Sequence, residues 1–235
     1  MSYSVIYQDL GLRDYKETWD FQVEIFTRLV ISKKQVTAAG DTDSESLPGT
    51  LIFVEHPNVY TLGKSGIETN LLLDQKQLQA RGASFYRIDR GGDITYHGPG
   101  QIVGYPIFDL SAVGIGLREY IFKLEEAIIR TVGEFDLRAS RLEGGTGVWL
   151  EPDNDQRARK ICAIGVKASR YVTMHGFALN VNTDLSYFSA INPCGFTDKG
   201  VTSLEKELGM TVDMELVREI TKARLKEVFD LEWKN

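Results

Sequence analysis

The order of apolar and polar residues along the chain predicts both helices and strands. Apolar side chains recur every three to four residues over 14–31, 117–135 and 213–229, which is the period of a helix with one buried face. Short apolar runs have instead the length and composition of strands. We expect strands at residues 4–8, 50–55, 83–88, 102–110, 147–151, 161–166 and 172–182, and two shorter helices at 74–82 and 204–208.

Strands interleaved with helices place the chain in the α/β or α+β class. The polar, acidic stretch 152–156 separates two of the strands and predicts a hairpin, so we expect a mixed β-sheet flanked by helices rather than a purely parallel one. With 235 residues, 43% of them hydrophobic, the chain can bury one substantial core. We expect a single domain over residues 1–235, with residues 33–49 as a polar, solvated insertion loop, either ordered or disordered.

Charge and cysteine content narrow the classes of function. The formal net charge of −6 argues against nucleic acid as the main partner. Cys162 and Cys194 are too few for a disulfide framework, and we see neither a signal peptide nor an apolar run that could cross a bilayer. We therefore expect a cytoplasmic protein with reduced thiols that binds no membrane. His56, His97 and His175 form no metal-binding motif, so we predict no metal site.

Residues 90–101 form the most distinctive stretch of the chain, with four glycines and one proline. This composition predicts a shaped loop without regular structure, whose backbone amides can meet a ligand closely. A long, ordered turn with no function is the alternative. Arg90, Tyr96 and His97 within the loop favour the functional interpretation, and His97 is the expected pocket histidine.

Three further residues are candidates for chemistry or for the core. Pro193 and Gly195 flank Cys194 and predict a turn that exposes the thiol while holding it in place, as a nucleophile requires; a small core residue is the alternative. Cys162 lies in an apolar run and is expected in the core. Lys160 stands where the acidic turn becomes a strand, and desolvation with nearby cations would favour its neutral amine, a usable base. A solvated lysine is the simpler interpretation.

Residues 157–170 contain five cationic side chains and no acidic one, against the negative balance of the whole chain. This run predicts a docking patch for an acidic partner, although a charged run is more often a solvated face.

Four motifs together resemble those of the lipoyl(octanoyl) transferase family. They are Arg90-Gly91-Gly92-x-x-Thr95-x-His97-Gly98-Pro99-Gly100-Gln101, Lys160-Ile161-x-Ala163-Ile164-Gly165, His175-Gly176-Phe177-Ala178-Leu179-Asn180-Val181-Asn182 and Asn192-Pro193-Cys194-Gly195. Their shared order makes chance a poor explanation. The resemblance implies the fold of the catalytic domains of biotin and lipoate protein ligases, and so one catalytic domain.

The resemblance also implies roles for individual residues. In that family the cysteine matching Cys194 carries the acyl group as a thioester, and the lysine matching Lys160 lowers the pKa of that thiol and serves as base. Three further segments bind the acyl substrate. In this chain they are Arg90, Gly91, Gly92, Asp93, Ile94, Thr95, Tyr96 and His97, then Ala163, Ile164 and Gly165, and then Gly176, Phe177 and Ala178.

The implied reaction moves an octanoyl group from octanoyl-acyl carrier protein to a lysine of a lipoyl domain, the first step of endogenous lipoate biosynthesis. The acceptors implied are the lipoyl domains of 2-oxoacid dehydrogenase complexes and the glycine cleavage H protein, and no cofactor is implied. The chemistry agrees, because a thiolate is the attacking form of cysteine and a neighbouring lysine can take its proton.

Three alternatives remain open on the sequence. An ATP-dependent lipoate or biotin protein ligase also uses a glycine-rich loop and a lysine, but it needs no nucleophilic cysteine such as Cys194. A non-catalytic module would only bind lipoyl domains. A cysteine hydrolase would release free octanoate.

Overall fold

The computed structural model describes residues 2–39, 47–192 and 199–234. Within these residues, nine strands form one large sheet in the order β12-β1-β2-β6-β10-β9-β8-β7, with β11 beside β9. The strands are β1 (Tyr3–Leu12), β2 (Gly49–Glu55), β6 (Gln101–Ile107), β7 (Ala139–Leu142), β8 (Gly145–Leu150), β9 (Arg159–Ser169), β10 (Val172–Asn180), β11 (Gly200–Val201) and β12 (Leu231–Lys234). β1 runs parallel to β2 and β12, and the strands from β2 to β7 in that order pair antiparallel. The predicted mixed sheet is confirmed.

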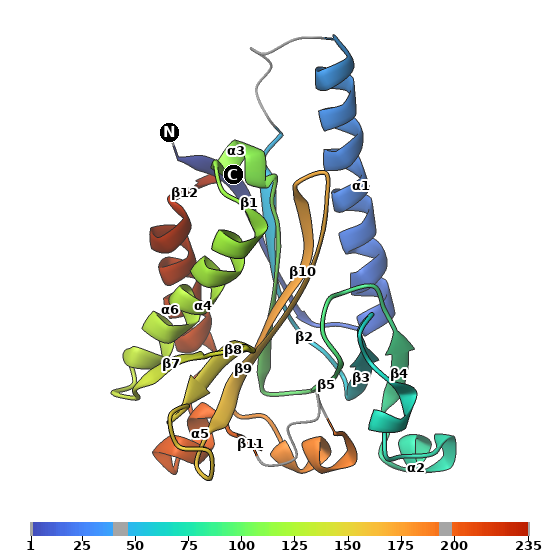
Figure 1. Cartoon of the computed structure of the whole chain (residues 1–235), viewed down its shortest axis with the longest axis vertical. Helices are drawn as coiled ribbons and strands as arrows, with labels where there is room; N and C mark the ends of the chain where they lie inside the picture. The colour runs from blue at the N-terminus through green and yellow to red at the C-terminus, as the bar shows by residue number, and fades with distance from the viewer. Residues whose placement is uncertain (1, 40–46, 193–198, 235) are drawn as a thin grey trace.

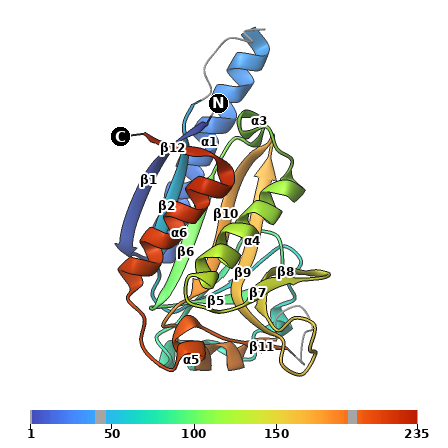
Figure 2. The same ribbon diagram turned by 90° about the vertical axis from the view of Figure 1, so that its left-hand side faces the viewer.

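Helices cover both faces of this sheet. Figure 1 and Figure 2 show α1 (Tyr15–Ala39) on one face, and α4 (Leu117–Gly133) with α6 (Met214–Phe229) on the other. Leu51 and Phe53 of β2 pack in the core beneath α4 and α6, while Ile52 and Val54 pack on the side of α1. Successive strand residues point to opposite faces, so β2 reads as a continuous apolar run because both faces are covered.

A second, three-stranded sheet consists of β4 (Ser84–Arg87), β3 (Val59–Leu62) and β5 (Ile94–His97), with α2 (Gln75–Ala80) next to it. This sheet corrects one expectation and adds a strand that was not expected. Residues 90–101 are not free of regular structure, because β5 lies inside them, and β3 was not predicted from the sequence. Four-residue strands between glycines carry too little periodicity to be recognised, and their pairing partners are distant in the chain.

The first helix is longer than predicted. It continues to Ala39, so the first seven residues of the expected insertion loop are helical. No glycine or proline lies between Tyr15 and Gly40, and Lys33 of this helix forms an ion pair with Asp109. The prediction of a loop over residues 33–49 was therefore wrong for residues 33–39, and also for Gly49, which begins β2. The central part of the predicted loop, residues 40–46, lies outside the described residues.

The remaining elements are short. They are α3 (Leu110–Val113), α5 (Leu204–Leu208) and the 3-10 helices η1 (Glu68–Asn70) and η2 (Leu185–Ala190). The strand expected over 102–110 ends at Ile107, because Asp109 caps the start of α3. β7 and β12 were not predicted from the sequence. Across residues 2–39, 47–192 and 199–234, none of the helices has the length and apolar character required to traverse a bilayer.

Candidate active site

A cavity of about 380 Å³ lies where the large sheet meets the small one. Its walls come from β6, β8, β9 and β10 of the large sheet, and from β5 with the preceding loop. Residues of α1, η2 and β11 complete the wall. The volume lies in the range of sites for small molecules and cofactors, and the cavity is lined mostly by apolar atoms.

The cavity brings together most of the residues named from the sequence. They are Lys160, Arg90, Gly92, Asp93, Ile94, Thr95, His97, Ala163, Ile164, Gly165, Gly176, Phe177 and Ala178. Gly91 and Tyr96 do not line it. The Gly91 N–H instead donates to the Val166 carbonyl at 2.9 Å, which ties the loop to β9.

Tyr96 lies on the other side of the small sheet. Its ring stacks on Tyr187 with centroids 4.7 Å apart, and its hydroxyl donates to Asn58 Oδ1 at 2.7 Å. Side chains alternate between the two faces of a strand, so a residue between Thr95 and His97 of β5 points away from the cavity that both of them line.

Cys194 lies outside the described residues. The residues nearest to it that the structure describes and that contribute to the cavity are Ile191 before it and Lys199 after it. Cys162, the other cysteine, is fully buried in the main core, as expected, and burial raises the pKa of its thiol far above the ordinary value.

Glycines shape the wall formed by β9 and β10. Gly165 and Gly176 are paired across these strands. A Cβ atom on Gly176 would lie 2.1 Å from the Gly104 carbonyl oxygen, and one on Gly165 would lie 2.9 Å from the Gly91 carbonyl oxygen. Neither position has room for a side chain, so backbone lines this part of the cavity.

Lys160 is positioned by strand pairing on both sides. Within β9 it is paired with Trp149 of β8 and with Val201 of β11. Its ammonium nitrogen lies 4.6 Å from the centre of the Trp149 ring, and both side chains line the cavity.

The cations expected to favour a neutral Lys160 are paired with acids. Arg159 forms ion pairs with Glu151 and Glu207, and Arg157 forms one with Glu151. A paired arginine presents little net charge to its neighbours, so the expected influence of these two cations on Lys160 is weakened by Glu151 and Glu207. Glu207 comes from α5, which is distant in sequence, and this is why a window of sequence could not reveal the pairing.

The basic patch expected over 157–170 is reduced in the same way. Lys167 forms an ion pair with Asp89, as do the two arginines with their own acids. Most of the positive charge of this run is therefore balanced by acidic side chains from other parts of the chain or from the turn before it.

His56 and His97 lie buried near the cavity, and both are neutral at physiological pH. Burial lowers the pKa of His97 to about 3 and that of His56 to about 4. Nδ1 of His97 is 2.8 Å from Gln101 Oε1, and its ring stacks on Tyr15 with centroids 6.0 Å apart. The side-chain amide of Gln101 donates to Asn180 Oδ1 at 2.8 Å, so a chain of polar contacts runs along the cavity wall from β5 to β10.

His175 also lines the cavity and has a strained backbone. Its φ is +63° although it lies in β10, and residues other than glycine rarely adopt this backbone conformation. Nε2 is 2.9 Å from an oxygen of Asp89, whereas Nδ1 is buried and has no hydrogen-bond partner among the described residues. Hydrogen bonds from His175 and Lys167 hold the pKa of Asp89 well below its usual range.

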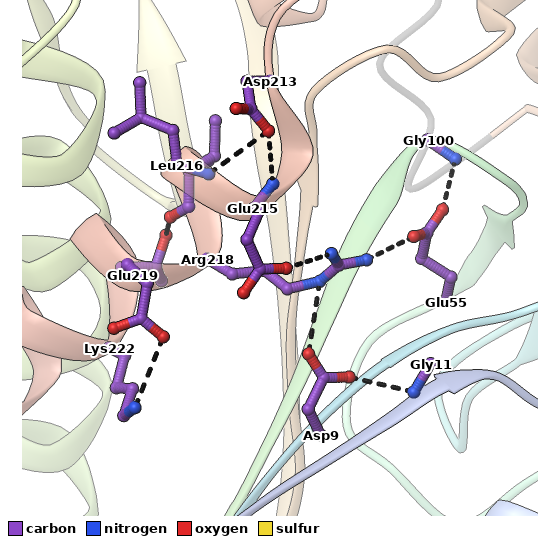
Figure 3. A network of polar contacts seen from close by, with 12 residues as sticks. Asp9, Gly11, Glu55, Gly100, Asp213, Glu215, Leu216, Arg218, Glu219 and Lys222 are labelled. Atoms are coloured by element: carbon purple, nitrogen blue, oxygen red, sulfur yellow. Dashed lines mark hydrogen bonds and ion pairs between the residues drawn. The ribbon is translucent and has the colours of Figure 1, made fainter.

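A network of polar contacts supports the turn at Gly100 (Figure 3). Arg218 of α6 forms ion pairs with Glu55 of β2 and with Asp9 of β1, the latter at 3.5 Å. The other carboxylate oxygen of Glu55 accepts the Gly100 N–H at 2.9 Å. The turn precedes Gln101, so the network connects the last long helix to the chain of polar contacts along the cavity wall.

Sequence reasoning missed several residues of the wall. They include Tyr15, Gln101, Tyr105, Trp149, Asn180 and Phe188. Gln101 and Asn180 were inside the quoted motifs and could have been named from them. Trp149 could not have been named from the sequence, because its proximity to Lys160 depends on the register of β8 against β9.

Comparison with known proteins gives three findings. Residues 14–226 match the family model described as the lipoyl protein ligase A/B catalytic domain. The octanoyltransferase of Cytophaga hutchinsonii is 53% identical over 233 residues, which cover 99% of this chain and 95% of that protein. A crystal structure of lipoate-protein ligase A bound with ATP superposes with a TM-score of 0.66 at 14% identity, covering 100% of this chain and 88% of that one.

The fold is shared more distantly with a biotin protein ligase. The enzyme from Aquifex aeolicus in complex with biotin and ATP has a TM-score of 0.51 at 12% identity, covering 97% of this chain and 70% of that one. At such identities the two ligases bear on the fold alone, and they confirm the fold expected from the sequence.

Proposed function

The chain belongs to the lipoyl protein ligase A/B catalytic domain family, and we propose that it is an octanoyltransferase of lipoate biosynthesis that works through a thioester on Cys194. Identity above one half over almost the whole chain supports octanoyl transfer. Proteins that carry lipoyl domains are the acceptors that this family implies. An acyl carrier protein is the donor that we propose.

One observation carries the covalent route. Lys160, the proposed base, lines the same cavity as members of all three segments expected to bind the acyl group. Ile191 and Lys199, on either side of Cys194 in the chain, also line this cavity, which supports a reacting thiol near the ammonium group of Lys160.

The first half of the reaction exchanges one thioester for another. Lys160 takes the proton of the Cys194 thiol, and the thiolate attacks the thioester carbonyl of the donor. A carbon–sulfur bond to Cys194 forms while the bond to the carrier sulfur breaks. The Lys160 ammonium then gives its proton to the departing thiolate, so no charge is left on the carrier.

The second half forms an amide. The neutral amine of the acceptor lysine attacks the acyl carbon of the Cys194 thioester, and the cysteine leaves as a thiolate. The extra proton of the attacking amine passes to Lys160. The energy of the donor thioester suffices for this step, so the proposed reaction consumes no ATP.

The experiment is an intact-mass measurement on the full chain after mixing with octanoyl carrier protein. We expect an octanoyl adduct on the wild type, none on Cys194→Ser, and at least a tenfold slower formation on Lys160→Met. Adding a lipoyl domain should discharge the adduct and octanoylate the domain. Absence of an adduct together with ATP-dependent acylation from free octanoate would identify a ligase instead. Release of free octanoate without transfer would identify a hydrolase, and binding of the lipoyl domain without acylation a docking module.

Two expectations from the sequence stay predictions. They are that the chain forms a single catalytic domain over residues 1–235 and that it is located in the cytoplasm.

A further inference from the structure

Trp149 of β8 lies against the ammonium group of Lys160. The 4.6 Å between Nζ and the ring centre is within the ~6 Å at which the negative face of an aromatic ring attracts a cation. Among aromatic side chains, indole attracts cations most strongly. Trp149 is only 2% exposed, so this contact is shielded from bulk water, which strengthens it.

A β-bulge brings these two side chains to the same face of the sheet. Val148 is paired with Cys162, but the next residue of β8, Trp149, is paired with Lys160, so one step in β8 spans two steps in β9. Ile161 is the extra residue. In a regular strand Lys160 and Cys162 would point to the same face. The bulge lets Cys162 enter the core while Lys160 lines the cavity opposite Trp149.

The hydrocarbon part of Lys160 passes close to Gly147. A Cβ atom on Gly147 would lie 3.4 Å from Cε of Lys160, and the φ of +120° suits glycine. The Gly147 N–H donates at 3.0 Å to the buried carboxylate of Glu125, so α4 fixes this part of β8. The indole N–H of Trp149 donates to the Gly145 carbonyl at 2.9 Å, which orients the ring. These contacts are those of a preorganised site.

We propose that Trp149 is a positioning residue for the transfer reaction: its indole face stabilises the ammonium form of Lys160 and thereby the thiolate form of Cys194. This inference rests on the proposed function, in which Lys160 takes the proton of Cys194. Proton transfer from the thiol to the amine creates a cation, and an aromatic face beside that cation favours the ion pair by about three- to tenfold. A purely structural role predicts the same packing with no effect on the thiol.

The test replaces Trp149 with tryptophans that carry one to four fluorine atoms, incorporated by stop-codon suppression. Fluorine withdraws electron density from the ring face at nearly constant shape, so it weakens the attraction for a cation while the packing is kept. The readout is the pH midpoint for alkylation of Cys194 by iodoacetamide, followed by peptide mass so that Cys162 is counted separately. We expect the midpoint to rise with each fluorine, by about 0.5 to 1 pH unit over the series.

Two controls distinguish the outcomes. The same series at Trp19, whose ring lies 5.8 Å from Nζ of Lys16 on α1, should leave the midpoint unchanged. In a Lys160→Met background, fluorination at Trp149 should have no effect. Thermal unfolding of every variant checks folding, and Trp149→Phe, with a weaker ring face, should fall within the series. The role of Trp149 would be overturned if the Lys160→Met substitution shifts the pH midpoint but fluorination of Trp149 in the otherwise wild-type chain does not. A wild-type chain that forms no acyl adduct would instead overturn the proposed function.

Discussion

Missing side chains shape the cavity wall as much as the side chains that are present. Gly165 faces the Gly91 carbonyl, and Gly91 in turn donates its N–H to Val166, so β9 and the loop that follows β4 are in backbone contact. The Arg90 side chain also lies close to Gly165, and it donates to the Thr61 carbonyl at 2.7 Å. A side chain at position 165 would therefore displace a loop that lines the cavity.

Gly165→Ala tests this contact. Its Cβ would lie 2.9 Å from the Gly91 carbonyl oxygen and 3.0 Å from Cδ of Arg90, so the loop must move. We expect kcat/KM for octanoyl transfer to fall at least about tenfold, with a loss of about 1–3 kcal/mol in unfolding free energy. The matched control is Gly133→Ala, at the exposed end of α4, where a Cβ meets nothing within 4 Å. It should keep full activity and gain about 0.5–1 kcal/mol in unfolding free energy. Equal activity of the two variants would contradict this account.

At the scale of elements, α6 is connected to the candidate site through charged contacts. Arg218 is only 12% exposed and contacts acids on β1, β2 and α6 itself. Glu55, its partner on β2, holds the Gly100 N–H. The turn between β5 and β6 thus depends on a helix that begins more than a hundred residues later in the chain.

Arg218→Met removes the cation and keeps much of the apolar volume. It leaves Glu55 and Asp9 close together without a compensating charge, so we expect a loss of about 2–3 kcal/mol in unfolding free energy and a several-fold loss of transfer activity. Urea unfolding and initial rates measure the two effects. Arg224→Met is the control, because Arg224 is more exposed and pairs with Glu134 and Glu227 on the surface. It should cost less than about 1 kcal/mol. Similar losses in both variants would rule out a special role for the network.

At the scale of the whole molecule, stability depends on keeping all three histidines neutral. Burial lowers the pKa of His56, His97 and His175 in the folded chain, whereas in the unfolded chain each returns to its ordinary value of about 6.5. The unfolded chain therefore binds more protons below this pH. Stability is fully present above about pH 6.5 and is lost as the pH falls towards the lowered pKa values.

We expect the unfolding free energy to be nearly constant from pH 8 to 7 and to fall between pH 6.5 and 5, by up to about 1.4 kcal/mol per pH unit for each histidine. Carboxylates titrate mainly below this window. Urea unfolding at half-unit intervals measures the slope. His97→Gln is less stable throughout but should show a shallower slope, because it removes one of the titrating groups. A flat profile in the wild type would show that folding does not lower the pKa values of the histidines. Identical slopes in the two proteins would show the same for His97 alone.

Much of the architecture was predictable because it is encoded locally. The long helices and the strands of the large sheet have apolar patterns that repeat within one element, and a pattern of this kind survives without knowledge of its partner. β3, β5, β7 and β12 were missed because each is four residues long and is a strand only through pairing with residues elsewhere. The end of α1 was misjudged because polar residues are compatible with a helix as well as with a loop.

By itself the sequence determined the class of the fold, the four motifs and the residue types available for an acyl transfer, since these depend on composition and order alone. Only the tertiary structure decided which motif residues meet. One residue more or less in a strand reverses the direction of every following side chain, so the bulge at Ile161 sets the side of Lys160, and alternation along β5 sends Tyr96 away from the cavity. Trp149 reaches Lys160 through that same register, which no pattern along the chain reveals.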